Sequence, residues 1–285
     1  MKPAPTIAFV TMMAALIAAP SGLPRRAMAD EPQRTDVPSF ARAVPAIHSG
    51  EPIFRFNGKD LAGFYTYLRG RGRDSDPHQV FTVRNGAICA SGEEFGGLIT
   101  RDEYHDYHLV VEWRWGERTW TPRKSSARDS GILVHCVGAD GAAGGTWMES
   151  QECQIIEGGT GDFLMVGGKN KPSLTCETRV GPDRQLYFEK GGKPVTLDSG
   201  RFNWWGRDPS WKDELGFRGG RDVEKATGEW NRMEVICDGD SITTILNGYL
   251  VNAGTRSSHT RGKVLFQSEG AEIFFRKIEV RPLMK

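Results

Sequence analysis

Apolar and polar residues alternate along most of the chain beyond residue 53, with the two-residue period that is typical of β-strands. The stretch 107–115 shows the pattern best, because every second residue from Leu109 to Trp115 is apolar and would face a core. Further stretches of strand-like sequence are 80–83, 87–89, 130–137, 151–157, 231–237, 241–246, 249–252, 263–267 and 272–280.

Pairs of turn-forming residues separate several of these stretches. Asn85-Gly86 predicts a hairpin, and Asp238-Gly239 with Asn247-Gly248 predicts a three-stranded meander over residues 231–252. The sequence contains no long segment with helical periodicity. Many short strands joined by short turns favour an all-β sandwich of antiparallel sheets.

The N-terminus has the pattern of an export signal. Lys2 precedes the apolar run 7–19, which is too short to span a bilayer as a helix, and Ala27-Met28-Ala29 matches a cleavage site. We expect cleavage near Ala29/Asp30 and a periplasmic or secreted product without a membrane span. The predicted division is a signal peptide (1–29), a flexible leader rich in proline and charge (30–52) and one sandwich domain (53–285).

Composition excludes several classes of function. The 37 basic and 36 acidic residues leave a net charge of +1, which gives no electrostatic reason to expect binding to nucleic acid or an anionic membrane. The sequence has no G-x-S-x-G, H-E-x-x-H, P-loop or dinucleotide-binding motif, so no organic cofactor is expected. It does not indicate the oligomeric state.

The cysteines are widely spaced, odd in number and set in apolar runs. Export permits disulfides, but buried free thiols are the favoured interpretation. If one pair forms, Cys136 with Cys153 is the expected one. The five cysteines are Cys89, Cys136, Cys153, Cys176 and Cys237.

The segment 147–162 concentrates acids and an amide. Alternation places Cys153 and Ile155 on a core side and turns Glu152 and Gln154 to the open face. An acid beside an amide suits sugar chemistry, although a solvated polar face explains the pattern equally well. A second acid at position 156 is missing, so the pattern disfavours a conventional two-carboxylate glycosidase.

His135 adds a second candidate group. Alternation along 130–137 places its side chain on the same open side as Glu152, where the two could act as acid and base or share a divalent metal ion. A histidine that is merely hydrogen-bonded at a strand end is the alternative.

A long segment, 198–227, interrupts the rhythm of strands and is rich in glycine, charge and tryptophan. Long loops in compact domains are usually functional or disordered. Trp204 and Trp205 could form a stacking platform for sugar rings, or they could pack onto the sandwich.

Seven short motifs, spread in order over about residues 53–283, resemble those of the 3-keto-disaccharide hydrolase domain family. The first is Phe56-Asn57-Gly58-Lys59-Asp60-Leu61-Ala62-Gly63-Phe64. The others are Gly97-Leu98-Ile99-Thr100, Asp129-Ser130-Gly131-Ile132, Glu152-Cys153-Gln154-Ile155-Ile156-Glu157, Gly228-Glu229-Trp230-Asn231, Leu246-Asn247-Gly248 and Phe274-Phe275-Arg276-Lys277-Ile278.

The resemblance implies a concanavalin A-like jelly-roll sandwich and a substrate that is a glycoside oxidised to a ketone at C3. The ketone acidifies the C2 proton, so one base can start a β-elimination across C1 and C2; hydrolysis is the other implied outcome. A non-catalytic lectin-like module is the alternative, since this architecture also serves binding proteins. The family commonly has Asn at the position of Asp129 and Arg near that of His135, so this chain departs from it at both.

Roles for individual residues follow from combining the resemblance with the pattern. We expect His135 and Glu152 to be catalytic and to hold a divalent metal, if one is bound, with Glu157 as a third catalytic candidate. The expected substrate-binding residues are Gln154, Asp162, Lys169, Arg114, Trp204 and Trp205.

Overall fold

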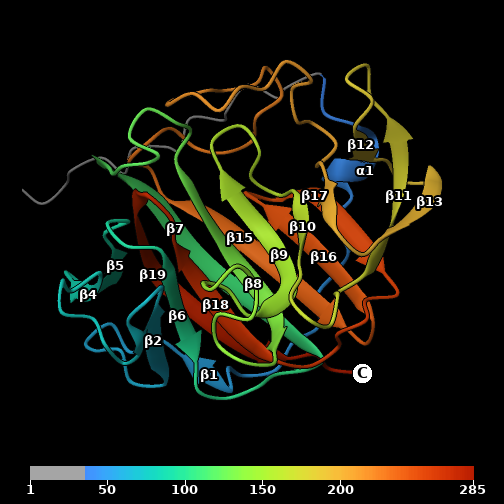
Figure 1. Cartoon of the computed structure of the whole chain (residues 1–285). Helices are drawn as coiled ribbons and strands as arrows, with labels where there is room; N and C mark the ends of the chain where they lie inside the picture. The colour runs from blue at the N-terminus through green and yellow to red at the C-terminus, as the bar shows by residue number, and fades with distance from the viewer. Residues whose placement is uncertain (1–35) are drawn as a thin grey trace, which may run out of the picture. The chain divides into compact units, whose positions relative to one another are not determined.

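The computed structural model describes residues 36–285 of the 285-residue chain, so the predicted signal peptide (1–29) lies outside the described part. One short helix, α1 (Ser39–Arg42), precedes a series of strands. These strands form two sheets, and every ladder between named strands is antiparallel. The predicted jelly-roll sandwich is confirmed (Figure 1).

The two sheets differ in size. The 11-stranded sheet contains, in spatial order, β12 (Leu186–Phe188), β11 (Leu174–Val180), β17 (Tyr249–Thr255), β16 (Ser241–Leu246), β15 (Asn231–Asp238), β7 (Tyr107–Thr119), β19 (Ala271–Pro282), β5 (Ala87–Ala90) and β4 (Phe81–Arg84), with β1 (Phe54–Arg55) beside β19 and β13 (Lys193–Leu197) beside β11. The 8-stranded sheet contains, in order, β14 (Gly200–Phe202), β10 (Phe163–Val166), β9 (Glu149–Ile156), β8 (Asp129–Val137), β18 (Lys263–Ser268), β6 (Gly96–Thr100), β2 (Phe64–Leu68) and β3 (Gly72–Arg73).

The core lies between the sheets and is built from the alternating apolar residues of both. Trp113 and Trp115 of β7 are buried on the inner face of the larger sheet, as the pattern of 107–115 predicts. Phe266 of β18 meets Phe275 of β19 with ring centroids 5.3 Å apart. Burial of these large aromatic surfaces supplies most of the driving force that holds the layers together.

The predicted turns are present. In the β4–β5 hairpin, Asn85 and Gly86 have φ of 50° and 76°, the conformation that a type I′ turn needs at both central residues. The meander forms as β15, β16 and β17, joined at Gly239 and at Asn247-Gly248.

The segment 36–52, expected to belong to a flexible leader, packs on the sandwich instead. Ala41 of α1 is fully buried, and the Phe40 ring meets Phe188 edge-on at 5.7 Å. Ser49 bridges to Leu283, next to the last strand. Small and apolar side chains in this stretch therefore extend the compact unit back to Asp36.

All five cysteines are free and buried, which confirms the favoured interpretation. The suggested Cys136–Cys153 pair does not form, because the two side chains leave opposite faces of the 8-stranded sheet. Cys153 belongs to the core between the sheets, whereas Cys136 packs with Leu133 and Leu265 on the outer face.

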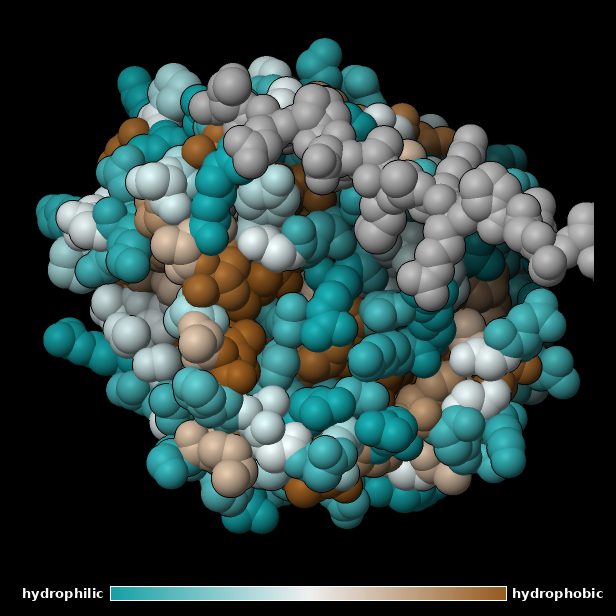
Figure 2. Space-filling view, turned by 180° about the vertical axis from the view of Figure 1, so that it is seen from behind, coloured by the Kyte–Doolittle hydropathy of each residue, from teal (hydrophilic) through white to brown (hydrophobic). Residues whose placement is uncertain are grey.

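The outer face of the 11-stranded sheet carries shallow apolar hollows but none of the candidate acids. One, of about 370 Å³, is lined mainly by β11, β16, β17 and the segment after α1, with Phe188 and Leu250 among its apolar residues. On the side opposite to Figure 1, Figure 2 shows hydrophobic surface within a hollow that is surrounded by hydrophilic side chains. Within residues 36–285, no helix is long and apolar enough to cross a membrane.

Candidate active site

The outer face of the 8-stranded sheet carries the acid and the amide that the sequence singles out. On β9, Cys153 and Ile155 enter the core, so alternation turns Glu152 and Gln154 outward, as predicted. Glu149, at the start of the same strand, accepts a hydrogen bond at Oε1 from the backbone N–H of Asn170 at 2.9 Å, and its Oε2 has no partner among the described residues.

Gly131 of β8 creates the space in which these side chains meet. Its cross-strand partner is Gln154. A Cβ added to Gly131 would lie 2.2 Å from Oε1 of Glu152 and 2.5 Å from Oε1 of Gln267 on β18. The side chains of Glu152 and Gln267 therefore lean over the glycine, and any larger residue there would displace them.

One side of Glu152 is apolar. Its cross-strand neighbour on β8 is Leu133, and Leu265 of β18 lies opposite Leu133 in the next ladder. These leucines belong to a second, smaller cluster on the outer face, together with Tyr65, Ile99, Cys136 and Met148. Glu152 thus stands at the border between an apolar patch and a polar one.

Three side-chain oxygens at this border have no hydrogen-bond partner in the part of the chain that the structure describes. They are the Oε1 atoms of Glu152, Gln154 and Gln267. The residues are only 4%, 4% and 1% exposed. Buried polar atoms are normally paired with protein or with ordered water, so these three neighbouring oxygens have free capacity to accept hydrogen bonds from water or from a polar ligand.

The environment makes Glu152 a weak acid. Burial raises the pKa of its carboxyl to about 8, and the charge of Asp129 acts in the same direction. Arg201 of β14 and the amide of Gln267 oppose the shift. A carboxyl group with such a pKa exchanges its proton near neutral pH, which suits general acid–base chemistry.

Two further carboxyls belong to the same cluster. Asp129, at the start of β8, is buried; its Oδ2 lies 3.1 Å from Nη2 of Arg123, and its Oδ1 has no partner. Burial raises the pKa of Asp129 to about 7, although Arg123 and Arg201 lower it. Glu269, which follows β18, has a pKa raised well above its usual value by burial and by the charges of Asp129 and Glu152. We call Asp129, Glu152 and Glu269 the site carboxyls.

The predicted placement of His135 beside Glu152 is wrong. The ladder between β8 and β9 shifts register between Val134 and Val137, and His135 adopts a φ of 51°. This bulge inverts the alternation, so the imidazole enters the core against Tyr107, with ring centroids 5.6 Å apart. The ring is fully buried, and burial lowers its pKa to about 4.

Glu157 and Asp162, predicted near the site, are already bonded within the protein. Glu157 pairs with Arg128 at 2.7 Å and accepts the backbone N–H of Gly216 at 2.7 Å. Asp162 pairs with Arg207 and accepts the backbone N–H of Trp204 at 2.8 Å. Both carboxylates hold the long segment after β14 against the sandwich, which leaves them little capacity for a substrate.

The two adjacent tryptophans of that segment do not form an exposed platform. Trp204 and Trp205 are 1% and 2% exposed and belong to the core, and the indole N–H of Trp205 donates to Leu250 O at 2.7 Å. The interpretation that the loop packs its aromatic residues onto the sandwich is the correct one for this pair.

The remaining two candidates lie elsewhere. Arg114 projects from the outer face of the larger sheet, where its guanidinium covers the rings of Trp230 and Phe274 at 5.0 and 4.9 Å. Lys169 is exposed in the loop after β10, beside the Asn170 backbone that binds Glu149. The structure therefore brings Glu152 and Gln154 together and leaves the other predicted residues outside this cluster.

Comparison with known families supports the sequence motifs. The model of the 3-keto-alpha-glucoside-1,2-lyase-like domain matches residues 51–281. The chain belongs to this family. Membership supports a role in carbohydrate chemistry, and the matched range contains all three site carboxyls. No match was found among curated proteins.

Solved structures of several carbohydrate-related proteins are similar in fold. A protein from Parabacteroides distasonis ATCC 8503 that is assigned as a glycosyl hydrolase is 20% identical over 80% of this chain and 92% of its own, with a TM-score of 0.47. A β-glucanase from Bacillus licheniformis is 12% identical over 84% of this chain and 100% of its own, with a TM-score of 0.41. A carbohydrate-binding module, CBM66 of Bacillus subtilis, is 9% identical over 78% and 94%, with a TM-score of 0.39.

The suggested metal ligands do not fit a shared ion. The side chains of His135 and Glu152 leave opposite faces of the 8-stranded sheet. Among residues 36–285, no group of three or more His, Cys, Asp or Glu side chains is arranged to hold a metal ion. We therefore derive no chemical step through a metal at this pair.

Several residues of the cluster could not be predicted as site residues from the sequence. Asp129 stands out only as a departure from the family pattern, and Gln267 is a single polar residue in the apolar run 263–267. Glu269, Arg123 and Arg201 carry no local signal, because they reach the cluster from three separate segments of the chain. Only the pairing of strands shows that they meet.

Proposed function

We propose that this protein cleaves glycosides that carry a ketone at C3, and that Glu152 is the base that removes the C2 proton. The observation that carries the proposal is the buried, unpartnered Oε1 of Glu152 above Gly131, on a carboxyl whose pKa of about 8 suits proton transfer. Membership of the 3-keto-alpha-glucoside-1,2-lyase-like family supports the class of substrate.

The reaction begins at the acidified C2–H bond. Glu152 in its carboxylate form takes the proton, and the electron pair of the C–H bond moves toward the C3 oxygen to give an enediolate. When the ketone re-forms, the pair becomes the C1=C2 double bond and the C1–O bond to the aglycone breaks. Arg201, whose charge already acts on Glu152 and Asp129, is the cation assigned to the developing negative charge.

The departing oxygen needs a proton, and a second carboxyl of the cluster can provide it. We assign this role to Asp129, because a pKa of about 7 keeps part of it protonated near neutral pH. The amide oxygens of Gln267, which leans over Gly131, and of Gln154, the cross-strand partner of Gly131, have no partner within residues 36–285 and can accept hydrogen bonds from sugar hydroxyls. These assignments need only residues of the described cluster.

The direct test uses a 3-keto-glucoside with a chromogenic aglycone beside the same glucoside without the ketone. We expect release from the keto compound only, and a product that contains a C1=C2 double bond and is lighter than the hydrolysed sugar by one water. A product with the mass of the hydrolysed sugar would show that water adds after elimination or in place of it.

Two outcomes would contradict the proposal. Release from both glucosides at similar rates would indicate a conventional glycosidase. Binding of the keto-glucoside without release, unchanged in the Glu152→Gln variant, would indicate the lectin-like alternative.

A further inference from the structure

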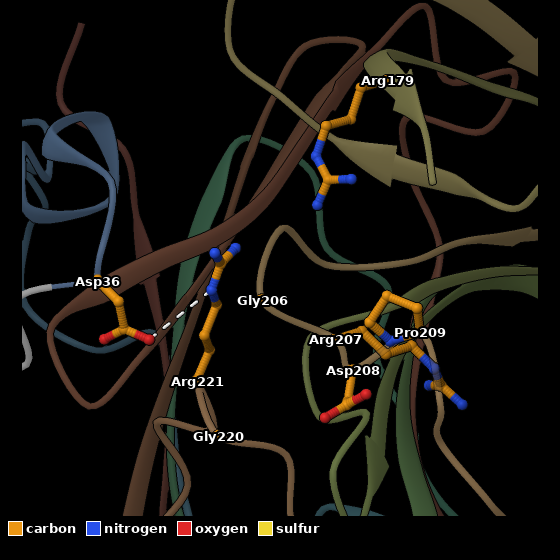
Figure 3. Close-up of a pocket in the computed structure, with 8 residues that line it drawn as sticks. All are labelled: Asp36, Arg179, Gly206, Arg207, Asp208, Pro209, Gly220 and Arg221. Carbon is orange, nitrogen blue, oxygen red and sulfur yellow. Dashed lines mark ion pairs between the residues drawn. The ribbon is translucent and has the colours of Figure 1, made fainter. Parts of the chain in front are cut away.

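A cavity of about 670 Å³ lies between β11 and the long segment after β14, and it shares no residue with the site carboxyls or with Gln154 and Gln267. Three arginines contribute to its wall (Figure 3). Its lining consists of Asp36, Arg179, Gly206, Arg207, Asp208, Pro209, Gly220 and Arg221.

Two of the arginines direct their charge into the cavity. Figure 3 shows the guanidinium groups of Arg179 and Arg221 extending from opposite sides toward the same space. The Arg179 group is held in place, because its Nη2 donates to Trp205 O at 3.3 Å and the group lies 4.7 Å from the ring centre of Tyr187. Like charges that face one space repel each other, and an anion between them offsets this repulsion by attracting both.

Within residues 36–285, neither arginine has a close carboxylate partner. Nε of Arg179 is 3.9 Å from a carboxylate oxygen of Glu189, whose side chain is 47% exposed. Nε of Arg221 is 3.7 Å from Asp36, and both of these side chains are about half exposed. Such long, solvated ion pairs contribute little and are readily exchanged for a better acceptor.

The other charged residues of the wall are occupied. Arg207 pairs with the buried Asp162, and its guanidinium points away from the other two in Figure 3. The Asp208 carboxylate accepts hydrogen bonds from the backbone N–H and the hydroxyl of Ser210 at 2.8 and 2.7 Å, so it is engaged within its own turn. The free donors of the cavity are therefore those of Arg179 and Arg221.

We propose that this cavity is a binding site for an oxyanion group, namely a carboxylate, sulfate or phosphate, which Arg179 and Arg221 bind from two sides. Guanidinium groups bind such groups through paired N–H···O contacts, which are stronger than neutral hydrogen bonds. The oxyanion can be a free inorganic ion or the acidic group of a sugar, and Gly220, where an added Cβ would meet nothing within 4 Å, leaves open space in the wall.

Isothermal titration calorimetry of the whole protein at constant ionic strength tests the site. The ligands are sulfate, phosphate and glucuronate, with glucose as the neutral control. We expect at least one oxyanion to bind and glucose not to bind here. Binding of sulfate or phosphate as tight as glucuronate identifies the free ion as sufficient, whereas binding of glucuronate alone identifies a sugar acid.

Variants locate the binding. Arg179→Gln and Arg221→Gln should each weaken it by about tenfold, the loss of one charge-assisted contact. The matched control is Lys193→Gln, on the exposed edge strand β13, which should leave it unchanged. Thermal melting confirms that the variants fold. No binding of any of the three anions, or equal affinity in all the variants, would overturn the proposal. The assay contains no keto-glycoside, so its result is independent of the proposed reaction.

Discussion

Two groups of carboxyls with restricted access to solvent lie on or near the sandwich, and they differ in their hydrogen-bond partners. In one group, which we call the anchor carboxylates, both oxygens of each carboxylate have partners in the protein; its members are Glu157, Asp162 and Glu224. Glu224, for example, accepts hydrogen bonds from Trp115 Nε1 and Thr160 Oγ1, both at 2.8 Å, and pairs with Arg218 at 2.9 Å. Among the site carboxyls, Asp129 and Glu152 each keep an oxygen without a partner.

The difference shows which property separates the two groups. Burial raises the pKa of Glu224 to about 8, the same value as that of Glu152, so a raised pKa does not separate the two groups. An oxygen without a hydrogen-bond partner among the described residues separates Asp129 and Glu152 from the anchor carboxylates, and the buried Glu149 shares this property at its Oε2. The anchor carboxylates hold the segment between β14 and β15 on the sandwich, and the site carboxyls remain available to a ligand.

The change with the largest expected effect is Glu152→Gln. It keeps the shape of the side chain but removes the base, so kcat/KM on a 3-keto-glucoside should fall by about 10²–10⁴-fold. The melting temperature should stay equal or rise, because no ion pair to Glu152 is lost. Glu112→Gln, on the outer face of the other sheet, is the control and should retain activity. A large loss of stability in Glu152→Gln would indicate that Glu152 has a structural role, like the anchor carboxylates.

The converse change is Glu157→Ala. It leaves Arg128 and the N–H of Gly216 without their acceptor, and the free energy of unfolding should fall by about 3 kcal/mol in urea titrations. Glu189→Ala removes an exposed carboxylate and should change it by less than about 0.5 kcal/mol. If Glu157→Ala unfolded no more easily than this control, the anchoring role would be wrong.

Asp129→Asn should change both the rate and its dependence on pH. Because Asp129 is the proposed proton donor to the departing oxygen, the maximal kcat/KM should fall by about 10²-fold. The charge of Asp129 raises the pKa of Glu152, so its removal should lower that pKa and keep the base active at lower pH. The acidic limb of the kcat/KM profile should move down by about one pH unit. A limb that does not move would show that another group controls the rate.

The smallest effect concerns stability against pH. A carboxyl whose pKa is near 8 in the folded state and near 4 in the unfolded state binds more protons when folded, so its contribution to stability declines as pH rises between these values. The melting temperature of Glu152→Gln relative to the unaltered protein should therefore increase by about 3 °C or more from pH 5 to pH 9. A difference that stays constant with pH would contradict the raised pKa.

The sequence predicts the sandwich well because alternation and turn residues are local signals. Glu152 and Gln154 face outward as predicted because β9 is regular through its central residues. His135 does not, because one bulge reverses the face of every later residue, and bulges depend on how the neighbouring strands pair.

The partners of Glu157 and Asp162 could not be predicted, for a related reason. These partners, Arg128 and Arg207, come from loops that only the folded structure brings to the end of β9. A sequence shows that an acid is present in a segment, but it does not show whether a distant arginine already neutralises it.

The most direct test of the central claim follows the C2 proton. A 3-keto-glucoside deuterated at C2 should react more slowly than the protonated compound, with a primary isotope effect on kcat/KM, and the protein should exchange the C2 hydrogen with D₂O in NMR spectra. Glu152→Gln should lose both the exchange and the turnover. Turnover without an isotope effect, or exchange that persists in Glu152→Gln, would contradict the assignment of Glu152 as the base.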